Sequence, residues 1–271
     1  MSLTIGITGH TGSLGKEIIK LKLNYKYSFF KGDIRNKNKV LQWLNSANFD
    51  AIIHLAAIVP IKIVNKNKKK TYNVNYKGTK NIIDAVKIKE IKWFFFCSTS
   101  HVYPSTKKKI SERSKTNPIS YYGRTKLLAE KYIIRKLEKS NTKYCIGRIF
   151  STTNKSQKRN YLVPDLIRKI KKAKKLITLE NLNHYRDFIS MEDIARIIFV
   201  LYKKKFCGII NIASGKAICL KDIAMQISNH YKKKIIFKDN DKKTYLVANI
   251  NKLKKIYKKD LVKNLKVALF K

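Results

Sequence analysis

A glycine-rich turn near the N-terminus constrains this chain more than any other feature. The run Thr8-Gly9-His10-Thr11-Gly12-Ser13-Leu14-Gly15 follows an apolar stretch at 3–8 and opens a helical pattern at 14–22. Glycines at such positions permit a tight turn, a close approach of a pyrophosphate and close helix–strand packing. The helix N-terminus adds free N–H groups. The predicted dinucleotide-binding residues of this turn are Gly9, Thr11, Gly12, Ser13, Leu14 and Gly15.

Short apolar runs alternate with longer helical patterns through the first 150 residues. We predict strands at 3–8, 51–55, 93–97 and 144–149, and helices at 14–22, 79–89 and 121–138. Strands this apolar are typical of a parallel sheet that is covered on both faces. The alternation therefore predicts an α/β fold with a doubly wound parallel sheet.

The regular alternation of apolar runs and helical patterns ends after residue 150. The polar segment Asn154–Asn160 is predicted as a loop, and the later patterns indicate helices at 163–172, 191–202 and 220–230 and a strand at 209–212. We expect residues 1–150 to form the dinucleotide-binding domain and 151–271 to form a smaller, partly interleaved substrate-binding lobe.

The chain is strongly basic, with 61 Lys and Arg against 17 Asp and Glu and a net charge of +44. Such a charge by itself would indicate a nucleic-acid or membrane surface. The lysines are scattered over the whole sequence, whereas single-strand binders combine a basic groove with stacking aromatics. We therefore expect no specific nucleic-acid partner, and an attraction for anionic substrates.

The cysteines and the N-terminus indicate a cytoplasmic protein. Cys97, Cys145, Cys207 and Cys219 lack the spacing of a zinc site or a redox pair, so no metal is expected. The N-terminus has no signal-peptide pattern. No apolar run reaches the roughly 18 residues that a membrane span needs.

A tyrosine and a lysine lie four residues apart at the start of the helix predicted at 121–138. Tyr122 and Lys126 therefore share one helical face. A free phenol has a pKa near 10, and a nearby ammonium is expected to lower it. This pair predicts a proton relay that works beside a hydride-transferring dinucleotide.

Polar side chains follow the strand predicted at 93–97. The segment from Ser98 to Pro104 includes Thr99, Ser100 and His101, and ligands in open α/β sheets bind beyond the carboxyl ends of strands. Thr99 is a candidate to orient a reacting oxygen. His101 is a candidate acid/base, because imidazole titrates near neutrality, or else a substrate contact.

These motifs together resemble the extended short-chain dehydrogenase/reductase family, in the branch that modifies nucleotide sugars. The resemblance implies a Rossmann-type fold and assigns Thr99, Tyr122 and Lys126 as catalytic, with the last two also at the cofactor. It assigns further motifs as well: Gly32–Asn36, His54–Ala57, Asn73–Thr79, His184–Ala195 and Asn211–Gly215. The further cofactor residues implied are Asp33, Ile34, Leu55, Ala56, Ala57 and Asn75, and the substrate residues implied are Thr99, Ser100, His101, Ser151 and Arg186.

Two departures from the family pattern limit what the resemblance implies. About ten residues separate the first helix from Gly32, which is too short for a strand, a helix and a further strand. No acidic residue matches the one that usually holds the adenosine ribose, and Lys22, Lys26 or Arg35 would suit a 2′-phosphate. The cofactor is therefore NAD or NADP, with the choice open.

The second departure concerns the reaction. In the family's 4,6-dehydratases the catalytic Thr is followed by Asp and Glu, but here Ser100 and His101 follow Thr99. Ser98–Pro104 resembles the 4-keto-6-deoxysugar reductases instead, and the His that some of these use for epimerisation aligns with Tyr161. The leading hypothesis is a reductase of a 4-keto nucleotide sugar for surface polysaccharide synthesis.

Two alternatives remain beside that hypothesis. A 4-epimerase with tightly held NAD would use the same Tyr122 in both directions. A non-catalytic dinucleotide-binding protein with a basic nucleic-acid surface is a third possibility, and the intact Tyr–Lys–Thr set argues against it. The resemblance also implies a homodimer formed through helices, one of which carries Tyr122.

Overall fold

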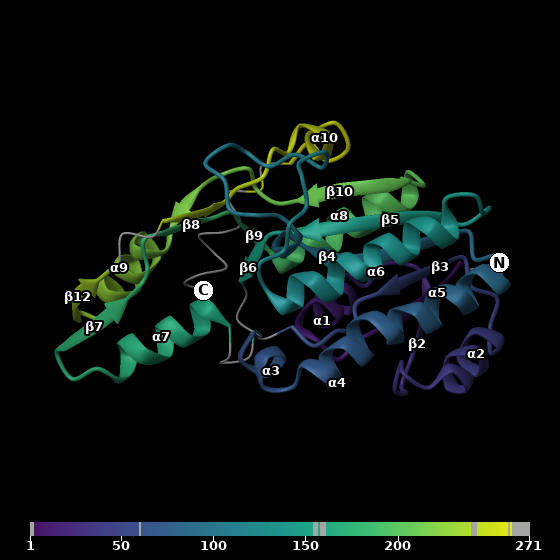
Figure 1. Cartoon of the computed structure of the whole chain (residues 1–271), viewed down its shortest axis with the longest axis horizontal. Coiled ribbons are helices and arrows are strands. Elements are labelled where there is room, and N and C mark those ends of the chain that lie inside the picture. Colours follow the sequence, from purple (N-terminus) through teal and green to yellow (C-terminus); the bar gives the residue numbers. More distant parts are fainter. Residues whose placement is uncertain are drawn as a thin grey trace.

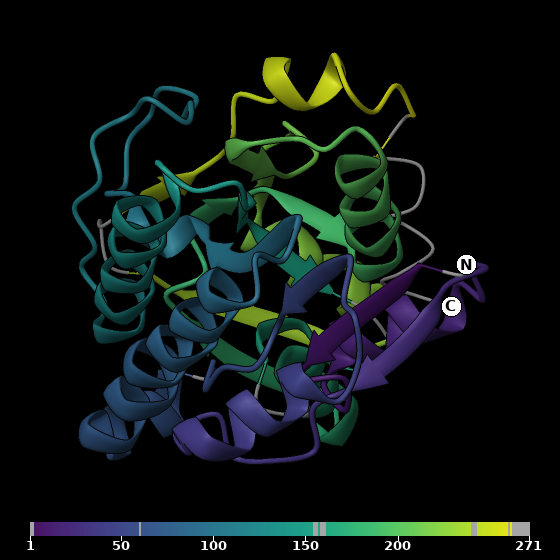
Figure 2. The ribbon, with the colours of Figure 1, turned by 90° about the vertical axis from the view of Figure 1, so that its right-hand side faces the viewer.

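A sheet of six parallel strands forms the centre of the molecule in the computed structural model, with helices on both faces (Figures 1 and 2). The structure describes residues 3–59, 61–153, 157, 161–239, 243–259 and 261. The predicted doubly wound α/β class is confirmed. The strands in spatial order are β10 (Gly208–Ile212), β5 (Lys143–Ile149), β4 (Trp93–Thr99), β3 (Ala51–His54), β1 (Thr4–Thr8) and β2 (Lys26–Phe29).

The apolar run of β4 shows why helices cover both faces of the sheet. Side chains alternate between faces along a strand. Trp93 and Phe95 pack into the core with α1 (Ser13–Lys20) and α8 (Met191–Lys203). Phe94 and Phe96 point to the opposite core, which is covered by α2 (Lys37–Asn45), α5 (Thr79–Ile88) and α6 (Tyr121–Leu137).

The parallel direction of the strands brings the carboxyl ends to one edge of the sheet. Thr8 at the end of β1 is in register with His54 at the end of β3. Thr99 at the end of β4 is in register with Ile149 at the end of β5. The predicted phosphate turn and the predicted catalytic segment therefore leave the sheet at the same edge.

The segment after α1 is short, as predicted. It holds only β2, which pairs with β1 at the edge of the sheet. Neither β2 nor α2 was predicted from the sequence. A signal for α2 was present, because Val40, Trp43 and Leu44 have helical spacing and the Asn36 side chain caps the helix by accepting from Lys39 N.

A second layer of structure comes from residues that follow β5, at the left of Figure 1. Its apolar core lies between α7 and α9. The helices predicted at 163–172, 191–202 and 220–230 and the strand at 209–212 are confirmed as α7, α8, α9 and β10. The second layer itself consists of α7 (Leu162–Lys172), α9 (Leu220–His230), β6 (Ser151–Thr153), β7 (Leu176–Glu180), β8 (His184–Arg186), β9 (Phe188–Ser190), β11 (Ile218–Cys219), β12 (Lys234–Lys238) and β13 (Thr244–Leu246).

Elements that follow residue 150 also belong to the main sheet and to the helices that cover it. Both α8 and β10 follow residue 150, yet β10 pairs with β5 in the main sheet and α8 packs against α1. The expected domain boundary between residues 150 and 151 therefore separates β5 from β10, although these two strands pair in the main sheet. The loop expected at 154–160 lies outside the described residues, apart from Gln157.

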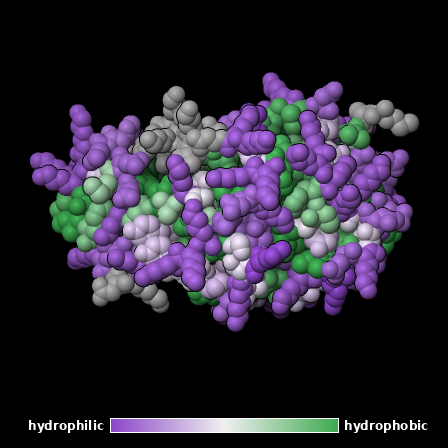
Figure 3. All heavy atoms as spheres, turned by 90° about the horizontal axis from the view of Figure 1, so that it is seen from above, coloured by the Kyte–Doolittle hydropathy of each residue, from purple (hydrophilic) through white to green (hydrophobic). Residues whose placement is uncertain are grey.

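Hydrophilic side chains are spread over the face seen in Figure 3, in keeping with the scattered lysines of the sequence. Some charged side chains of the molecule form local pairs, among them Lys80–Asp84 and Arg196–Glu192 along single helices. Exposed pairs of this kind add little stability. No helix in the described part of the chain is long and apolar enough to cross a membrane.

Candidate active site

The three glycines of the first turn have different surroundings. Gly9 has φ +73°, and a Cβ there would lie 2.6 Å from the Ala56 nitrogen. A Cβ on Gly15 would lie 2.6 Å from the His10 Cα. Gly12 is exposed and precedes α1, so its backbone is open to an anion at the helix N-terminus. This cradle fits the diphosphate of a dinucleotide.

Hydrogen bonds to Thr8 and to Asn75 hold the segment that follows β3. The Leu55 nitrogen donates to the Thr8 carbonyl (3.1 Å), and the Ala56 nitrogen donates to Thr8 Oγ1 (3.3 Å). Buried Asn75, in the π-helix η1 (Asn73–Gly78), exchanges two hydrogen bonds with the Ile58 backbone (2.8 and 2.9 Å). The structure thus lines Leu55, Ala56 and Ala57 up beside the phosphate turn.

Asp33 and Ile34 lie beyond the end of β2. Asp33 is exposed and forms a salt bridge with Arg35, which lowers the pKa of its carboxyl. Ile34 is buried, and a Cβ on Gly78 would lie 2.5 Å from its Cγ1. The segment therefore packs against η1, the helix that contains Asn75.

Tyr122, Thr99 and His101 meet at the carboxyl edge of the sheet. Thr99 ends β4, and His101 lies in the 3-10 turn η2 (Ser100–Val102). The rings of His101 and Tyr122 are 5.9 Å apart and nearly perpendicular. The Thr99 hydroxyl accepts a hydrogen bond from His101 N (3.2 Å), and Thr99 is close enough to Tyr122 to lower the pKa of its phenol against the larger effect of burial. A strand end and a helix N-terminus thus place the predicted catalytic groups together.

Gly123 explains how α6 comes so close to η2. A Cβ at this position would lie 2.2 Å from the His101 carbonyl oxygen and 2.9 Å from its carbon. The helix begins at this point because the Ser120 side chain accepts a hydrogen bond from Gly123 N (3.1 Å). The predicted site residues did not include this glycine.

The ionisation of the Tyr–Lys pair differs from the sequence-based expectation. Burial raises the pKa of Tyr122, and neighbouring Cys97 and Tyr161 raise it further, whereas Lys126 was expected to lower it. Burial also lowers the pKa of Lys126 to about 8. The Lys126 Nζ lies 3.9 Å from the centroid of the Phe96 ring. Desolvation therefore sets the direction of both pKa shifts.

Cys97 and Tyr161 are site neighbours that the predicted residue set omits. Cys97 is two residues before Thr99 in β4, so both side chains lie on the same face of the sheet. That spacing could have identified it. Tyr161 directly precedes α7 and is half-buried, and burial and Cys97 raise the pKa of its phenol.

His101 and Arg186 interact across the two layers. Burial lowers the pKa of His101, and the positive charge of Arg186 lowers it further. His101 is therefore neutral at neutral pH. Arg186 donates to the Tyr185 carbonyl (2.8 Å) and to Thr244 Oγ1 (2.9 Å), and burial lowers its own pKa.

The other two predicted substrate residues lie at the same edge with different surroundings. Ser100 is buried, and its carbonyl accepts a hydrogen bond from Tyr103 N (3.0 Å). Ser151 is half-buried at the start of β6, and its nitrogen donates to the Asp187 carbonyl (2.9 Å). Backbone hydrogen bonds therefore hold both positions in place.

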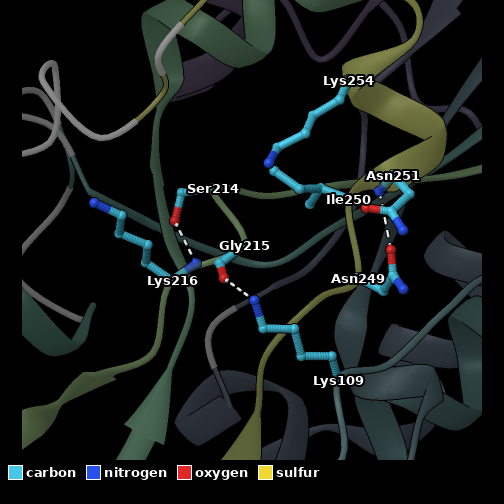
Figure 4. A pocket seen from close by; sticks show the side chains of 8 residues that line it. All are labelled: Lys109, Ser214, Gly215, Lys216, Asn249, Ile250, Asn251 and Lys254. Atoms are coloured by element: carbon cyan, nitrogen blue, oxygen red, sulfur yellow. Dashed lines mark hydrogen bonds between the residues drawn. The ribbon is translucent and has the colours of Figure 1, made fainter.

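A hollow seen in Figure 4 is separate from this site. Lysines from three segments line it, and Lys109 Nζ donates to the Gly215 carbonyl (3.0 Å). None of its lining residues belongs to the predicted catalytic, cofactor or substrate residues. They are Lys109, Ser214, Gly215, Lys216, Asn249, Ile250, Asn251 and Lys254, the last two from α10 (Asn251–Lys254).

Comparisons with known proteins agree with this geometry. The model of the NAD dependent epimerase/dehydratase family matches residues 5–213. The chain therefore belongs to that family, whose members are NAD(P)-dependent nucleotide-sugar enzymes of the extended short-chain dehydrogenase/reductase group.

Three similar proteins illustrate the range of the family. GDP-6-deoxy-D-talose 4-dehydrogenase of Aggregatibacter actinomycetemcomitans is 31% identical over 224 residues, which cover 79% of this chain and 75% of that protein. The structure of RMD from Pseudomonas aeruginosa with NADPH has a TM-score of 0.85 and 17% identity, covering 94% and 92%. UDP-glucose 4-epimerase of Thermus thermophilus with NAD has a TM-score of 0.82 and 18% identity, covering 93% and 92%.

Proposed function

We propose that this protein is an NAD(P)-dependent reductase of a 4-keto nucleotide sugar, acting in surface polysaccharide synthesis. The observation that carries the proposal is the meeting of Thr99, His101 and Tyr122 without a carboxylic acid after Thr99. Elimination of water needs an acid to protonate the leaving hydroxyl. The relative named as a 4-dehydrogenase of a GDP-6-deoxy sugar further supports chemistry at C4.

The raised pKa of Tyr122 suits the reductive direction. A neutral phenol can donate its proton to the C4 oxygen as that oxygen gains charge. The nicotinamide, when bound, supplies the hydride to C4. Lys126 then stabilises the phenolate, because an ammonium one helical turn away attracts it. Thr99 orients the reacting oxygen through its hydroxyl, and neutral His101 contacts the sugar.

The remaining predicted residues divide between cofactor and substrate in this proposal. Arg186 holds the diphosphate of the nucleotide sugar, and Ser100, His101 and Ser151 line the sugar. Tyr122 and Lys126 also contact the cofactor. The other cofactor residues are Gly9, Thr11, Gly12, Ser13, Leu14, Gly15, Asp33, Ile34, Leu55, Ala56, Ala57 and Asn75.

A 4-epimerase is the close alternative, because such an enzyme uses the same Tyr in both directions. The experiment that separates the two is a screen of nucleotide sugars and their 4-keto forms with NADH and NADPH. Consumption of reduced cofactor with a 4-keto substrate supports the reductase. Conversion between two sugars without net cofactor consumption, with NAD retained through purification, would replace it by the epimerase.

We propose NADPH as the preferred cofactor, because a lysine stands where Rossmann domains usually carry an acid. The acid that binds the ribose lies about 20 residues beyond the glycine turn. Phe30 N still donates to the Ile7 carbonyl (3.0 Å), so exposed Lys31 comes directly after the ladder between β1 and β2. An ammonium there attracts a 2′-phosphate and offers nothing specific to a ribose hydroxyl.

Replacing this lysine by an acid is expected to reverse the preference. In Lys31→Asp, we expect the affinity for NADPH to fall about 10- to 100-fold, the range of one hydrogen bond to a charged group. The affinity for NADH should stay the same or rise. Fluorescence titration of the reduced cofactors measures both. Lys87→Asp, the same charge change at an exposed position of α5, is the control. An unchanged NADPH/NADH ratio in Lys31→Asp would refute the assignment.

We propose a homodimer through α6, whose outward face makes association sensitive to salt. Four exposed residues lie along one side of this helix: Arg124, Leu128, Lys131 and Arg135. A two-fold axis brings like charges together, and salt screens their repulsion. We expect the dimer fraction to rise between about 0.05 and 0.5 M NaCl in sedimentation velocity. A dimer that dissociates with added salt would contradict this interface.

The cytoplasmic location stays a prediction. All four cysteines are free in the structure. A reducing compartment agrees with that state. Imaging of the tagged full chain in its host, or fractionation of that host, would test the location.

A further inference from the structure

A buried ion pair lies one helical turn beyond Lys126. Glu130 of α6 accepts three hydrogen bonds from Arg148 of β5, from Nε to both carboxylate oxygens (3.1 Å each) and from Nη2 to Oε2 (2.7 Å). The side chains are only 1% and 5% exposed. Ser98 of β4 also donates to this carboxylate. The pair therefore joins α6 to two neighbouring strands.

The arginine extends this cluster away from the helix. Arg148 Nη1 donates to the Tyr103 hydroxyl (2.7 Å), which in turn donates to Asn211 Oδ1 (2.9 Å). Asn211 is in β10, so the cluster spans α6, β4, β5 and β10. Well-packed apolar residues often replace such buried pairs without loss of stability. A role in positioning is therefore a better reason for the pair than stability.

The partners of Glu130 are adjacent to the proposed catalytic groups. Ser98 directly precedes Thr99 in β4. Glu130 follows Lys126 by four residues on α6, so the two side chains are on one face. A shift of α6 along the strands would break the bonds to Ser98 and Arg148 together. The cluster therefore fixes the helix that carries Tyr122 against the strand that carries Thr99.

We propose that Glu130 is a positioning residue that registers α6 on β4 and β5 and keeps the Lys126 ammonium charged in its buried site. This inference rests on the roles proposed above for Tyr122 and Lys126. What it adds is that the buried Glu130 carboxylate controls the charge of Lys126, the lysine proposed to contact the cofactor and the Tyr122 phenol.

Two neighbours raise the pKa of Lys126 against the larger effect of burial, first Cys97 and then Glu130. Cys97 faces Lys126 from β4, His54 from β3, and Tyr122 lies on its own helix. Burial raises the pKa values of Cys97 and Tyr122 and lowers that of His54 to about 3, so all three are neutral at pH 7. With Cys97 neutral, the Glu130 carboxylate that pairs with Arg148 is the charged neighbour that raises the pKa of Lys126.

The test compares Glu130→Gln with the double variant Glu130→Gln/Arg148→Met. Removing the carboxylate alone leaves Arg148 buried and unpaired, so the single variant should unfold at a lower temperature. The double variant should recover much of that stability. In both, we expect Lys126 to lose its proton about one pH unit lower. The basic limb of the kcat profile should move by the same amount, with little change in KM.

A direct titration of Lys126 makes the result independent of turnover. Lysines labelled with 13C at Cε give the protonation state by NMR, and the ring of Phe96 should shift the Lys126 signal away from the others. Lys126→Arg assigns the signal by its loss. Glu192→Gln, which removes an exposed carboxylate from α8, is the charge-matched control and should leave the titration unchanged.

The outcomes separate this inference from the proposed function. A Lys126 titration in the double variant that matches the wild type overturns the role of Glu130, whatever the enzyme's substrate. If the wild type turns over no nucleotide sugar, the proposed function fails, and the NMR titration still decides the coupling between Glu130 and Lys126.

Discussion

Tyr122→Phe is expected to lower kcat about 10²- to 10⁴-fold on the substrate that the screen identifies, the usual contribution of general acid–base catalysis. The phenol is buried, and it meets Thr99 from β4 and His101 from η2. Phenylalanine keeps the ring contact with His101 and removes only the hydroxyl. The loss should therefore appear in kcat, with KM and the affinity for the reduced cofactor nearly unchanged.

Controls distinguish this chemical loss from a structural one. The thermal midpoint of Tyr122→Phe should stay close to that of the wild type, because one hydrogen bond contributes about 0.5–1.5 kcal/mol. Tyr121→Phe changes the neighbouring tyrosine, which is half-buried, and should leave kcat intact. Full turnover by Tyr122→Phe would exclude the mechanism proposed here.

Gly123→Ala is expected to have the second large effect, although it changes no catalytic group. The new methyl would lie 2.2 Å from the His101 carbonyl oxygen, which is backbone and has little freedom to move. The helix must then shift away from η2. Overpacking of this kind costs about 1–3 kcal/mol of stability. A misplacement of about 1 Å at a reacting group lowers kcat on the order of 10²-fold.

Thermal unfolding and kcat measure the two effects separately. The control is Ile88→Ala, because Ile88 is 67% exposed at the end of α5, has no role in the proposed site or dimer, and can be shortened without a clash. A Gly123→Ala variant with the midpoint and the turnover of the wild type would show that α6 does not need this close approach.

Six helices were predictable because the apolar spacing of a helix is local. The six predicted helices correspond to α1, α5, α6, α7, α8 and α9, and their ends agree to within two residues. The strand β2 was missed because Lys26–Phe29 is short and lies at the sheet edge, where its side chains are only partly buried. Its pairing with β1 comes from residues more than 20 positions away in sequence.

Part of the candidate site could likewise be predicted from local sequence, and part of it depends on contacts between distant elements. Helical geometry alone puts Tyr122 and Lys126 on one face, and the order of the motifs puts Thr99 at a strand end. The contact of Tyr122 with His101, the approach of α6 at Gly123 and the pair between Glu130 and Arg148 join residues from different elements. No local pattern specifies those distances.

The sequence by itself determined the dinucleotide turn, the family and the identity of the Tyr–Lys pair, because each depends on neighbouring residues. Only the tertiary structure decided how that pair ionises. Burial raises the pKa of Tyr122 and lowers that of Lys126 to about 8, opposite to the effect expected of the pair alone. Desolvation depends on everything that packs around a group, and that environment is assembled from strands and helices far apart in the chain.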